Sequence, residues 1–310
     1  MRYEMNFVYF KGDFVPLKEA KISILTHAFN YGTGVFEGIK GYYNQKHNQL
    51  YIFRIIEHFE RMKKNCRILK ICLEKPTEEL KDLVVELARR NKYKTDIYIR
   101  PLAYKSSEKV GVKLPEEFDL CIYAVPVSHY FDPKKPIKAC LSSWRRIEDN
   151  SIPGRGKITG AYVNSALAAQ EARDNGFDEA IFLNQDGHVS EGAAMNLFLI
   201  KDGMLHTPSV SQNILEGITR EAVMNISREE LGIETMERII DRTELYTADE
   251  VFLCGTLSEV VSVGSIDRRA INRGKIGKIT KEIIRLFHKI VNGEIEKYRK
   301  WLTPVYKSSL

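Results

Sequence analysis

Short β-type runs broken by turn residues recur along this chain, and only a few helical patterns interrupt them. Phe7–Phe10 is followed at once by a Gly12-Asp13 turn. In the second half, Asn184–Gly187 and Lys201–Gly203 each place an Asp-Gly pair between two β-rich runs, which is a strong hairpin signal. A regular alternation of strands and helices would indicate a parallel sheet. Because the chain lacks that alternation, the pattern predicts an α+β fold.

Two helices are expected in the first half, over a meandering sheet. Apolar residues recur at helical spacing from Ile56 to Leu69, and Pro76-Thr77 opens a second helical stretch. The segment 128–136 contains two prolines and is predicted to be a linker. We therefore expect a small N-terminal α/β domain at residues 1–127, an interdomain loop at 128–136 and a larger C-terminal domain at 137–310.

The composition argues against several classes of protein. No apolar stretch approaches the roughly 20 residues that cross a bilayer, and the first residues include acids and no small-residue cleavage site. The five cysteines are scattered and form no C-x-x-C pair, which argues against a disulfide framework or a zinc site. The net charge is +6, but basic and acidic residues are interleaved, as on solvated helix faces. We expect a cytoplasmic protein that binds no metal, membrane or nucleic acid.

Two well-known nucleotide-binding motifs are incomplete in this chain. Gly156-Lys157 would need a glycine at position 151 and a hydroxyl residue at position 158 to form a P-loop, but the chain has Ser151 and Ile158. The glycines at 32 and 34 are followed by one at 38 instead of 37, so they form no dinucleotide fingerprint. Nucleotide binding by either motif is therefore not expected.

Two other segments offer backbone groups to an anion. Gly217-Ile218-Thr219 stands at the start of a predicted helix, where unpaired N–H groups and the helix dipole favour negative charge. Gly255-Thr256 follows a predicted strand. Taken alone, the first segment is better explained as an ordinary helix start with Thr219 near the cap, and the second as a simple turn. Neither segment decides the function.

One lysine and one glutamate lie among small residues. Lys157 lies in the glycine-rich loop 153–160 after a predicted strand, so its amine can reach a cleft with little obstruction. A lysine that forms imines must be partly desolvated so that the neutral amine is available. Glu191 follows a predicted strand and is flanked by Ser190 and Gly192, a setting in which a carboxylate can approach a flat ligand. Taken in isolation, a surface lysine and a turn carboxylate are the better explanations.

These candidates form an ordered set of motifs that covers nearly the whole chain. The motifs are His27–Ile39, Glu57–Met62, Tyr98–Leu102, Glu191–Phe198, Leu205–Thr207 and Leu215–Arg220. The set resembles the signature of the class IV aminotransferases, and its first half resembles the branched-chain amino-acid aminotransferases of that class. The resemblance implies the two-domain α+β fold of fold-type IV enzymes, which is D-amino-acid aminotransferase-like with a barrel-like sheet in the larger domain. It also implies pyridoxal 5'-phosphate as the cofactor.

The resemblance implies roles for the residues that would hold the cofactor. Lys157, in the larger domain, would form the internal Schiff base and then carry the proton between the substrate Cα and C4′ of the cofactor. Glu191 would face the pyridine nitrogen and keep it protonated, which strengthens the ring as an electron sink. Tyr162 would donate to the phenolate oxygen. The residues implied at the phosphate combine a guanidinium, hydroxyls and N–H groups: Arg61, Gly217, Ile218, Thr219, Gly255 and Thr256.

For the substrate, the resemblance implies a branched apolar side chain in one half-reaction and the glutamate carboxylate in the other. The expected reaction is ping-pong transamination between leucine, isoleucine or valine and 2-oxoglutarate. Arg100 would pair with the glutamate carboxylate, and the N–H groups of Thr256 and Leu257 would hold the α-carboxylate. The apolar wall would come from Phe36, Gly38, Tyr98, Tyr130 and Met195 or its neighbours.

The resemblance also implies a homodimer, because residues like Tyr31 reach the neighbouring subunit's pocket in this family. Without the resemblance, plain core packing explains Phe36 and Tyr130 equally well. One departure is Ala194-Met195, where branched-chain enzymes commonly carry Gly-Glu, and it leaves the substrate range open. The pair Arg145-Arg146 fits either substrate attraction or two surface charges.

Other activities share the implied fold, and the fold alone does not separate them. The alternatives are a D-amino-acid aminotransferase, an R-selective amine transaminase and an aminodeoxychorismate lyase. The stretches Tyr98–Leu102 and Phe36–Gly38 favour the branched-chain enzyme. A non-enzymatic anion or nucleic-acid binder is the alternative from a different class, and the joint presence of Arg61, Lys157 and Glu191 argues against it.

Overall fold

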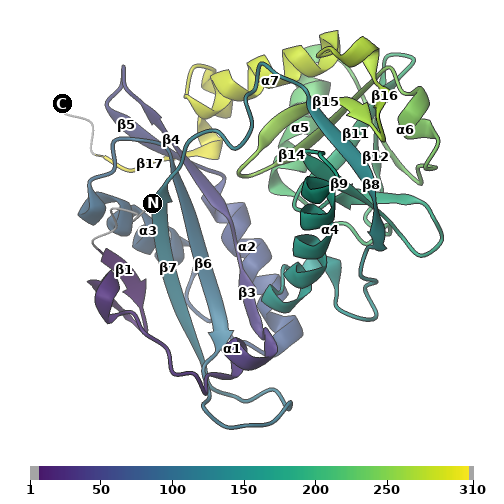
Figure 1. The fold of residues 1–310 in the computed structure, drawn as a ribbon. Coiled ribbons are helices and arrows are strands. Elements are labelled where there is room, and N and C mark those ends of the chain that lie inside the picture. The colour runs from purple at the N-terminus through teal and green to yellow at the C-terminus, as the bar shows by residue number, and fades with distance from the viewer. Residues whose placement is uncertain (1–6, 307–310) are drawn as a thin grey trace. The chain divides into compact units, whose positions relative to one another are not determined.

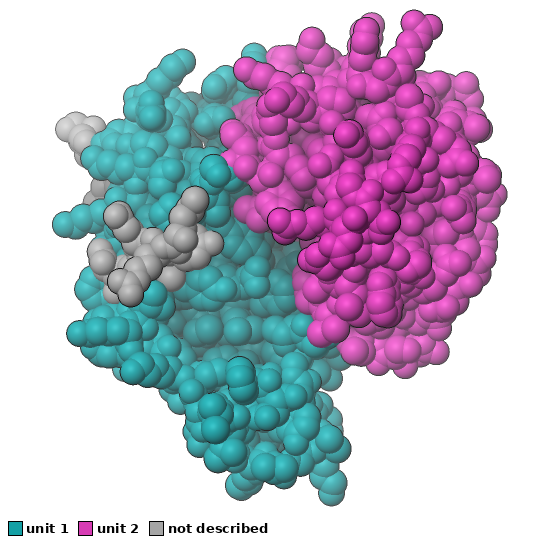
Figure 2. Space-filling model, in the orientation of Figure 1, with its two compact units in different colours: residues 1–128, 156–160, 289–310 teal, residues 129–155, 161–288 magenta. Residues whose placement is uncertain are grey.

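The computed structural model describes residues 7–306, which fall into two compact units (Figure 1 and Figure 2). The first unit comprises residues 1–128, 156–160 and 289–310, and the second comprises residues 129–155 and 161–288. These units differ from the expected domains in two segments. The short segment that carries Lys157, and the C-terminal segment from residue 289, belong with the N-terminal residues instead of with the larger C-terminal domain.

Long-range backbone pairing explains both differences. Within the first unit, Ile158 forms an antiparallel bridge with Val35, and the Phe36 N–H donates to the carbonyl of Lys157 at 3.2 Å. The C-terminal strand β17 (Leu302–Pro304) pairs with β5 (Gln49–Phe53). Because such partners are far apart along the chain, local periodicity carries no signal for them.

The first unit is built on an eight-stranded sheet within the described residues, in the order β17-β5-β4-β6-β7-β1-β2, with β3 paired to β6. Its other strands are β1 (Phe7–Phe10), β2 (Asp13–Pro16), β3 (Gly34–Phe36), β4 (Ile39–Asn44), β6 (Ile97–Lys105) and β7 (Phe118–Pro126). Its helices are α1 (His27–Tyr31), α2 (Ile55–Cys66) and α3 (Thr77–Asn91), with 3-10 turns at Leu17–Glu19, Arg67–Leu69 and Glu296–Trp301.

Helices α2 and α3 pack on each other and against strands of this sheet, α2 on β3 and α3 on β1 and β7. The apolar residues predicted at helical spacing provide the contact face: Phe59 and Met62 of α2 and Leu80 of α3 are fully buried. Burial of one apolar stripe is what anchors an amphipathic helix to a sheet. The expectation of two helices over a meandering sheet is therefore confirmed for this unit.

The second unit is built on a nine-stranded sheet within the described residues, in the order β10-β9-β8-β15-β14-β11-β12-β13, with β16 paired to β15. Its strands are β8 (Ile137–Arg145), β9 (Glu179–Leu183), β10 (Val189–Gly192), β11 (Asn196–Lys201), β12 (Met204–Pro208), β13 (Thr235–Arg238), β14 (Glu250–Gly255), β15 (Glu259–Ile266) and β16 (Arg269–Ala270). Parallel pairs join β8 to β9 and β15, and β12 to β13, while the remaining pairs are antiparallel. The mixture confirms the expected α+β class.

Both predicted hairpins are present in this sheet. Leu183 pairs with Val189 across the first, and Lys201 pairs with Met204 across the second. In the second turn Asp202 has a φ of 52° and Gly203 a φ of 76°. Positive φ at both central positions is the requirement of the tight turn that fits the twist of two antiparallel strands.

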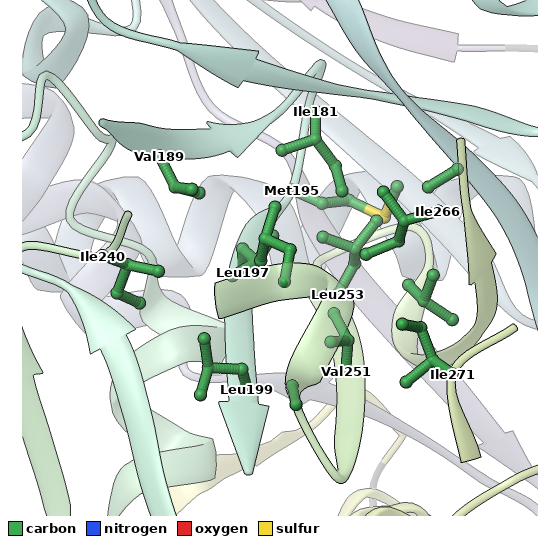
Figure 3. Packing of buried hydrophobic residues seen from close by; sticks show 14 of the residues in the cluster. Ile181, Val189, Met195, Leu197, Leu199, Ile240, Val251, Leu253, Ile266 and Ile271 are labelled. Carbon is green, nitrogen blue, oxygen red and sulfur yellow. The ribbon is translucent and has the colours of Figure 1, made fainter. Parts of the chain in front are cut away.

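The helices of the second unit are α4 (Tyr162–Asp174), α5 (Ile218–Leu231), α6 (Glu244–Thr247) and α7 (Lys278–Val291). The last three residues of α7 belong to the first unit. Short 3-10 turns lie at Asn272–Gly274 in this unit, and at Gly154–Gly156 and Thr159–Ala161 where the chain passes between the second unit and residues 156–160 of the first. An apolar cluster that includes Ile181, Leu197, Leu253 and Ile266 fills the interior against the sheet (Figure 3). Across residues 7–306, no helix combines the length and apolar character needed to cross a membrane.

Candidate active site

Lys157, the lysine predicted to bind the cofactor, is held in an uncommon backbone conformation in the first unit. Its φ is 43°, in the left-handed region, which costs a residue other than glycine on the order of 1–3 kcal/mol. The pairing with Val35 and Phe36 fixes this conformation. The side chain is half-buried, with Nζ 4.9 Å from the centroid of the Phe36 ring. An amine beside an aromatic face is partly desolvated, as imine chemistry requires.

Arg61, in the same unit, forms a cluster with two buried side chains, those of Glu37 and His58. Its Nε donates to Oε1 of Glu37 at 2.8 Å, and its Nη2 donates to Oε2 at 2.7 Å. Nδ1 of His58 contacts the same Oε2 at 2.8 Å. Two parallel N–H···O bonds fix the plane of a guanidinium as well as its position. Glu37 and His58 were missed as functional candidates, although both lie inside motifs that carried the family resemblance.

The charges in this cluster are fixed by their partners. Burial alone would raise the pKa of Glu37, but the Arg61 guanidinium and the hydrogen bond from His58 hold it well below its usual range. Burial lowers the pKa of His58, against the opposing effect of Glu37. Glu37 is therefore ionised and His58 neutral at neutral pH, so Nδ1 of His58 is the donor. The result is a rigid support for the Arg61 cation.

Four candidate substrate residues of the first unit, Phe36, Gly38, Tyr98 and Arg100, lie together. Nη2 of Arg100 donates to the Tyr98 hydroxyl at 2.8 Å, and its guanidinium carbon lies 4.3 Å from the centroid of Phe36. Gly38 is required next to them, because a Cβ there would lie 2.2 Å from the Tyr98 hydroxyl oxygen. Among the described residues, Nε of Arg100 is buried without a hydrogen-bond partner. An apolar ring and a cation with one unused donor thus stand side by side.

Tyr31 lies in a different part of the first unit, exposed at the end of α1. Its hydroxyl accepts from the N–H of Gly111 at 3.3 Å, and its ring lies 4.7 Å from that of His27. Its neighbourhood is apolar and open to solvent, since Ile24 and Phe29 are also exposed.

Glu191 is the centre of a polar network in the second unit. It lies within β10, not after a strand as expected, and its side chain is buried. Nη2 of Arg146 contacts Oε1 at 2.5 Å, while Nδ2 of Asn196 and the N–H of Leu215 donate to Oε2 at 2.9 and 3.1 Å. The sequence alone gave the pair Arg145-Arg146 no definite role. In the structure Arg146 is a partner of Glu191, the carboxylate predicted to bind the cofactor, whereas Arg145 is exposed.

Asn196 connects this network to the start of α5. Its Nδ2 also donates to the carbonyl of Leu215 at 2.8 Å, and a Cβ on Gly217 would lie 2.0 Å from its Oδ1. Gly217 is the N-cap residue of α5, in an extended conformation, and as a glycine it has no side chain of its own to cap the helix. The network therefore fixes the position of the first turn of α5, including Thr219, relative to the Glu191 carboxylate.

The remaining candidates of the second unit lie at the ends of other elements. Gly255 ends β14, and Thr256 and Leu257 form the turn that leads into β15. Tyr162 is the first residue of α4. Tyr130 is exposed, with its ring 4.6 Å from that of Phe131. Met195 belongs to the apolar core cluster (Figure 3), so packing accounts for it. In the part of the chain that the structure describes, no cluster of three or more metal-binding side chains is present.

Comparison with known proteins gives one consistent answer. Residues 34–266 match the model of the family described as amino-transferase class IV. A probable branched-chain-amino-acid aminotransferase of Aquifex aeolicus (strain VF5) is 50% identical over 305 residues, which cover 98% of both chains.

Two solved structures are similar over nearly their whole length. The branched-chain amino acid aminotransferase of Thermobaculum terrenum in its PLP form has a TM-score of 0.91 at 37% identity, covering 99% of this chain and 100% of that one. The branched-chain aminotransferase of the thermophilic archaeon Thermoproteus uzoniensis, solved with norvaline, has a TM-score of 0.92 at 42% identity, covering 97% of this chain and 99% of that one.

Proposed function

This chain belongs to the class IV aminotransferases and has their fold-type IV architecture, and we propose that it transfers amino groups between branched-chain L-amino acids and 2-oxoglutarate with pyridoxal 5'-phosphate as cofactor. The observation that carries the substrate assignment is the set Phe36, Tyr98 and Arg100. An apolar wall suits a branched side chain, and a guanidinium with a buried, unused N–H suits the second carboxylate of 2-oxoglutarate. The names of the similar proteins support the branched-chain substrates.

The residues present fit a phosphorylated pyridine aldehyde. The start of α5, with a glycine before it and the Thr219 hydroxyl in its first turn, suits a phosphate, because helix N–H groups and the helix dipole favour an anion. A buried carboxylate suits a protonated ring nitrogen, and Glu191 is such a group. When bound, the cofactor supplies a carbon that takes the amino group and a ring that accepts the electrons of the broken Cα–H bond.

In this proposal each residue has a defined task. The Lys157 amine anchors the cofactor and, once released by substrate, moves the proton at the substrate Cα. Glu191 accepts a hydrogen bond from the ring nitrogen, and Tyr162 donates to the ring oxygen. The phosphate is held by residues that offer N–H and hydroxyl donors and one guanidinium: Arg61, Gly217, Ile218, Thr219, Gly255 and Thr256.

For the substrate, the N–H groups of Thr256 and Leu257 would hold the α-carboxylate in both half-reactions. Arg100 then decides between the two substrates. Its aromatic stacking on Phe36 keeps the guanidinium in place when a branched side chain is bound, and its N–H groups bind the distal carboxylate when 2-oxoglutarate is bound.

We also propose that the chain acts as a homodimer in the cytoplasm. Large exposed apolar side chains gather near the predicted dimer residue Tyr31, and these are Ile22, Ile24, Leu25, Phe29, Val110 and Val112. The two segments that carry them are joined by the bond from the Gly111 N–H to Tyr31. Exposed apolar patches of this kind mark interfaces. The five free cysteines suit a reducing compartment. Sedimentation equilibrium measures the assembly.

A single half-reaction tests the proposed function. The purified, cofactor-loaded protein is mixed separately with L-leucine, D-alanine and an R-amine, and loss of the absorbance of the lysine-bound cofactor is followed. L-leucine is expected to react fast and the others slowly. Fast reaction with D-alanine or the amine and an inert L-leucine would leave the family but reject the substrate assignment. Lys157→Ala is the control that must abolish the signal.

The Arg100→Met variant then separates the two substrates. It should lower kcat/KM for 2-oxoglutarate by about 10- to 100-fold, the worth of a hydrogen bond between charged groups, while the L-leucine half-reaction keeps its rate. Equal losses for both substrates would show that Arg100 does not select the distal carboxylate.

A further inference from the structure

Arg146 is a charged partner of Glu191 within the second unit. Its Nη2 lies 2.5 Å from Oε1 of Glu191, and its Nε donates to the carbonyl of Asn213 at 3.2 Å. The guanidinium carbon lies 5.5 Å from the centroid of Phe182. With a side chain that is 11% exposed, Arg146 is anchored on three sides and largely shielded from water.

The two oxygens of Glu191 are used differently. Oε1 receives the cation, whereas Oε2 accepts from two neutral donors, the Asn196 amide and the Leu215 N–H. Hydrogen bonds and a nearby cation all favour the ionised form of a buried acid. An ionised carboxylate can only accept hydrogen bonds. A ring nitrogen that faces it must therefore supply the proton itself.

We propose that Arg146 is a positioning residue that keeps Glu191 ionised and oriented, and that it thereby sets the protonation of the cofactor's ring nitrogen. The inference rests on the proposed function, because it assumes that Glu191 faces that nitrogen. A carboxylate and a pyridine can share one proton in two ways, as an ion pair or as two neutral groups. A cation on the far side of the carboxylate stabilises the ion pair and leaves the neutral pair unchanged. Arg146 thus favours the protonated ring.

The Asn213 contact extends the role of Arg146 to the loop that precedes Lys157. The side-chain oxygen of Asn213 accepts from the N–H of Asp149 at 3.1 Å, and a Cβ on Gly154 would lie 2.5 Å from the Asn213 carbonyl oxygen. Arg146 therefore ties the Glu191 carboxylate to the backbone against which residues 149–154 pack. A loss of the arginine side chain is expected to loosen this segment as well as the carboxylate.

The chain offers a matched control in the preceding residue. Arg145 is exposed, and its carbonyl accepts from the Asn164 side chain at 3.0 Å, a bond that substitution of the side chain does not remove. Arg145→Met and Arg146→Met therefore make the same chemical change in adjacent residues. Arg146→Lys keeps a cation but gives up the fork that binds Glu191 and Asn213 together.

The experiment measures the protonation of the ring nitrogen directly. Wild type, Arg145→Met, Arg146→Met and Arg146→Lys are reconstituted with pyridoxal 5'-phosphate labelled with nitrogen-15 in the ring, and the nitrogen chemical shift of each holoenzyme is recorded from pH 6 to 9. Thermal unfolding of each apoprotein checks that the variant is folded. The wild type, Arg145→Met and Arg146→Lys should give the protonated signal, and Arg146→Met should shift toward the neutral pyridine signal.

A wild-type signal in Arg146→Met would overturn the inference. A neutral signal in Arg146→Lys would also overturn it, because the lysine keeps the charge to which the effect is assigned. If Arg146→Met does not fold, the signal of Arg146→Lys alone tests the inference. Glu191→Gln separates this failure from that of the proposed function. If the glutamine variant leaves the nitrogen signal unchanged, Glu191 does not face the ring; if it changes the signal and Arg146→Met does not, only the role of Arg146 is lost.

Discussion

Glu37 in the first unit and Glu179 in the second are both buried carboxylic acids, yet their pKa values move in opposite directions. Glu37 is 0% exposed, and burial alone would raise its pKa, but Arg61 and His58 hold it well below its usual range. Glu179 is 6% exposed and accepts backbone N–H bonds from Ala180 and Ala193 at 2.9 and 3.2 Å. These bonds lower its pKa less than burial raises it, and the pKa reaches about 7.

The difference shows that the charge of the partner, and not the depth of burial, decides whether a buried acid is ionised. A cation within hydrogen-bonding distance compensates for lost hydration, whereas neutral N–H donors compensate only in part. By this criterion Glu191 resembles Glu37, because it too has an arginine partner. Glu37 therefore holds a fixed charge near neutral pH, whereas Glu179 gains or loses a proton there.

The largest effect is expected from Glu37→Gln, which keeps the shape of the side chain and removes its charge. Arg61 would keep its cation in a nearly buried place but lose the carboxylate that accepts its two parallel hydrogen bonds, and loss of one partner of such a pair costs about 3–5 kcal/mol. Urea unfolding at pH 7 measures the loss of stability. The control is Glu60→Gln, at an exposed position on α2, the helix that carries Arg61. It should change the free energy of unfolding by less than about 0.5 kcal/mol.

The pH dependence of this loss follows from the sign of the shift. Because folding lowers the pKa of Glu37, its contribution is fully present above the ordinary value of 4.5 and is lost as the pH falls toward the lower folded value. The gap between wild type and Glu37→Gln should therefore close in acid. A gap that stays constant from pH 7 to 3 would show that charge is not its cause.

The opposite sign is expected at Glu179. Folding raises its pKa from 4.5 to about 7, so its contribution to stability is fully present below pH 4.5 and is lost as the pH rises through 7. This rise in pKa corresponds to roughly 3 kcal/mol of free energy of unfolding, at about 1.36 kcal/mol for each pKa unit. A glutamine keeps an oxygen for the two N–H donors and cannot ionise.

Glu179→Gln should therefore be more stable than wild type at pH 8.5, by up to about 3 kcal/mol, and nearly equal to it at pH 5. Unfolding by urea at both pH values checks this. A variant less stable than wild type at pH 8.5 would mean that ionised Glu179 has a compensating partner, and the contrast with Glu37 would then disappear.

Local features of this fold were predictable from the sequence because their causes are local. The Asp202-Gly203 turn follows from a dipeptide that tolerates positive φ, and the start of α5 at Ile218 follows from the glycine before it and the apolar periodicity after it. The amphipathic spacing around Phe59 gave the buried face of α2. In each case neighbours along the chain decide the structure.

The partners of the candidate site residues were not predictable in this way. In the first unit, Glu37 follows β3 and its partner Arg61 lies in α2. In the second unit, Arg146 follows β8 and its partner Glu191 lies in β10. An ion pair between distant segments leaves no periodicity in either one. For the same reason local patterns did not group Lys157 with the N-terminal residues, because its loop is defined by pairing with Val35. Motif resemblance named the candidates, and only the structure names their partners.

The smallest effect is expected at Arg238 and Glu244, which form a bidentate pair as Arg61 and Glu37 do, but closer to water. The two guanidinium nitrogens of Arg238 contact the two oxygens of Glu244 at 2.8 and 2.6 Å, and the side chains are 27% and 21% exposed. The hydrogen bond from Arg238 lowers the pKa of Glu244 to about 2, so the contribution is present above pH 4.5 and is lost toward pH 2.

Because water solvates both charges of this pair once it is broken, Glu244→Gln should cost only about 0.2–1 kcal/mol at pH 7, and less at high salt. Urea unfolding at low salt and in 1 M NaCl, run beside Glu37→Gln, measures both. If Glu244→Gln cost as much as Glu37→Gln, the bidentate geometry alone would account for the stability of both pairs. If it costs several times less, the exclusion of water around Arg61 is what makes its carboxylate partner indispensable, and the same is then expected of Arg146 and Glu191.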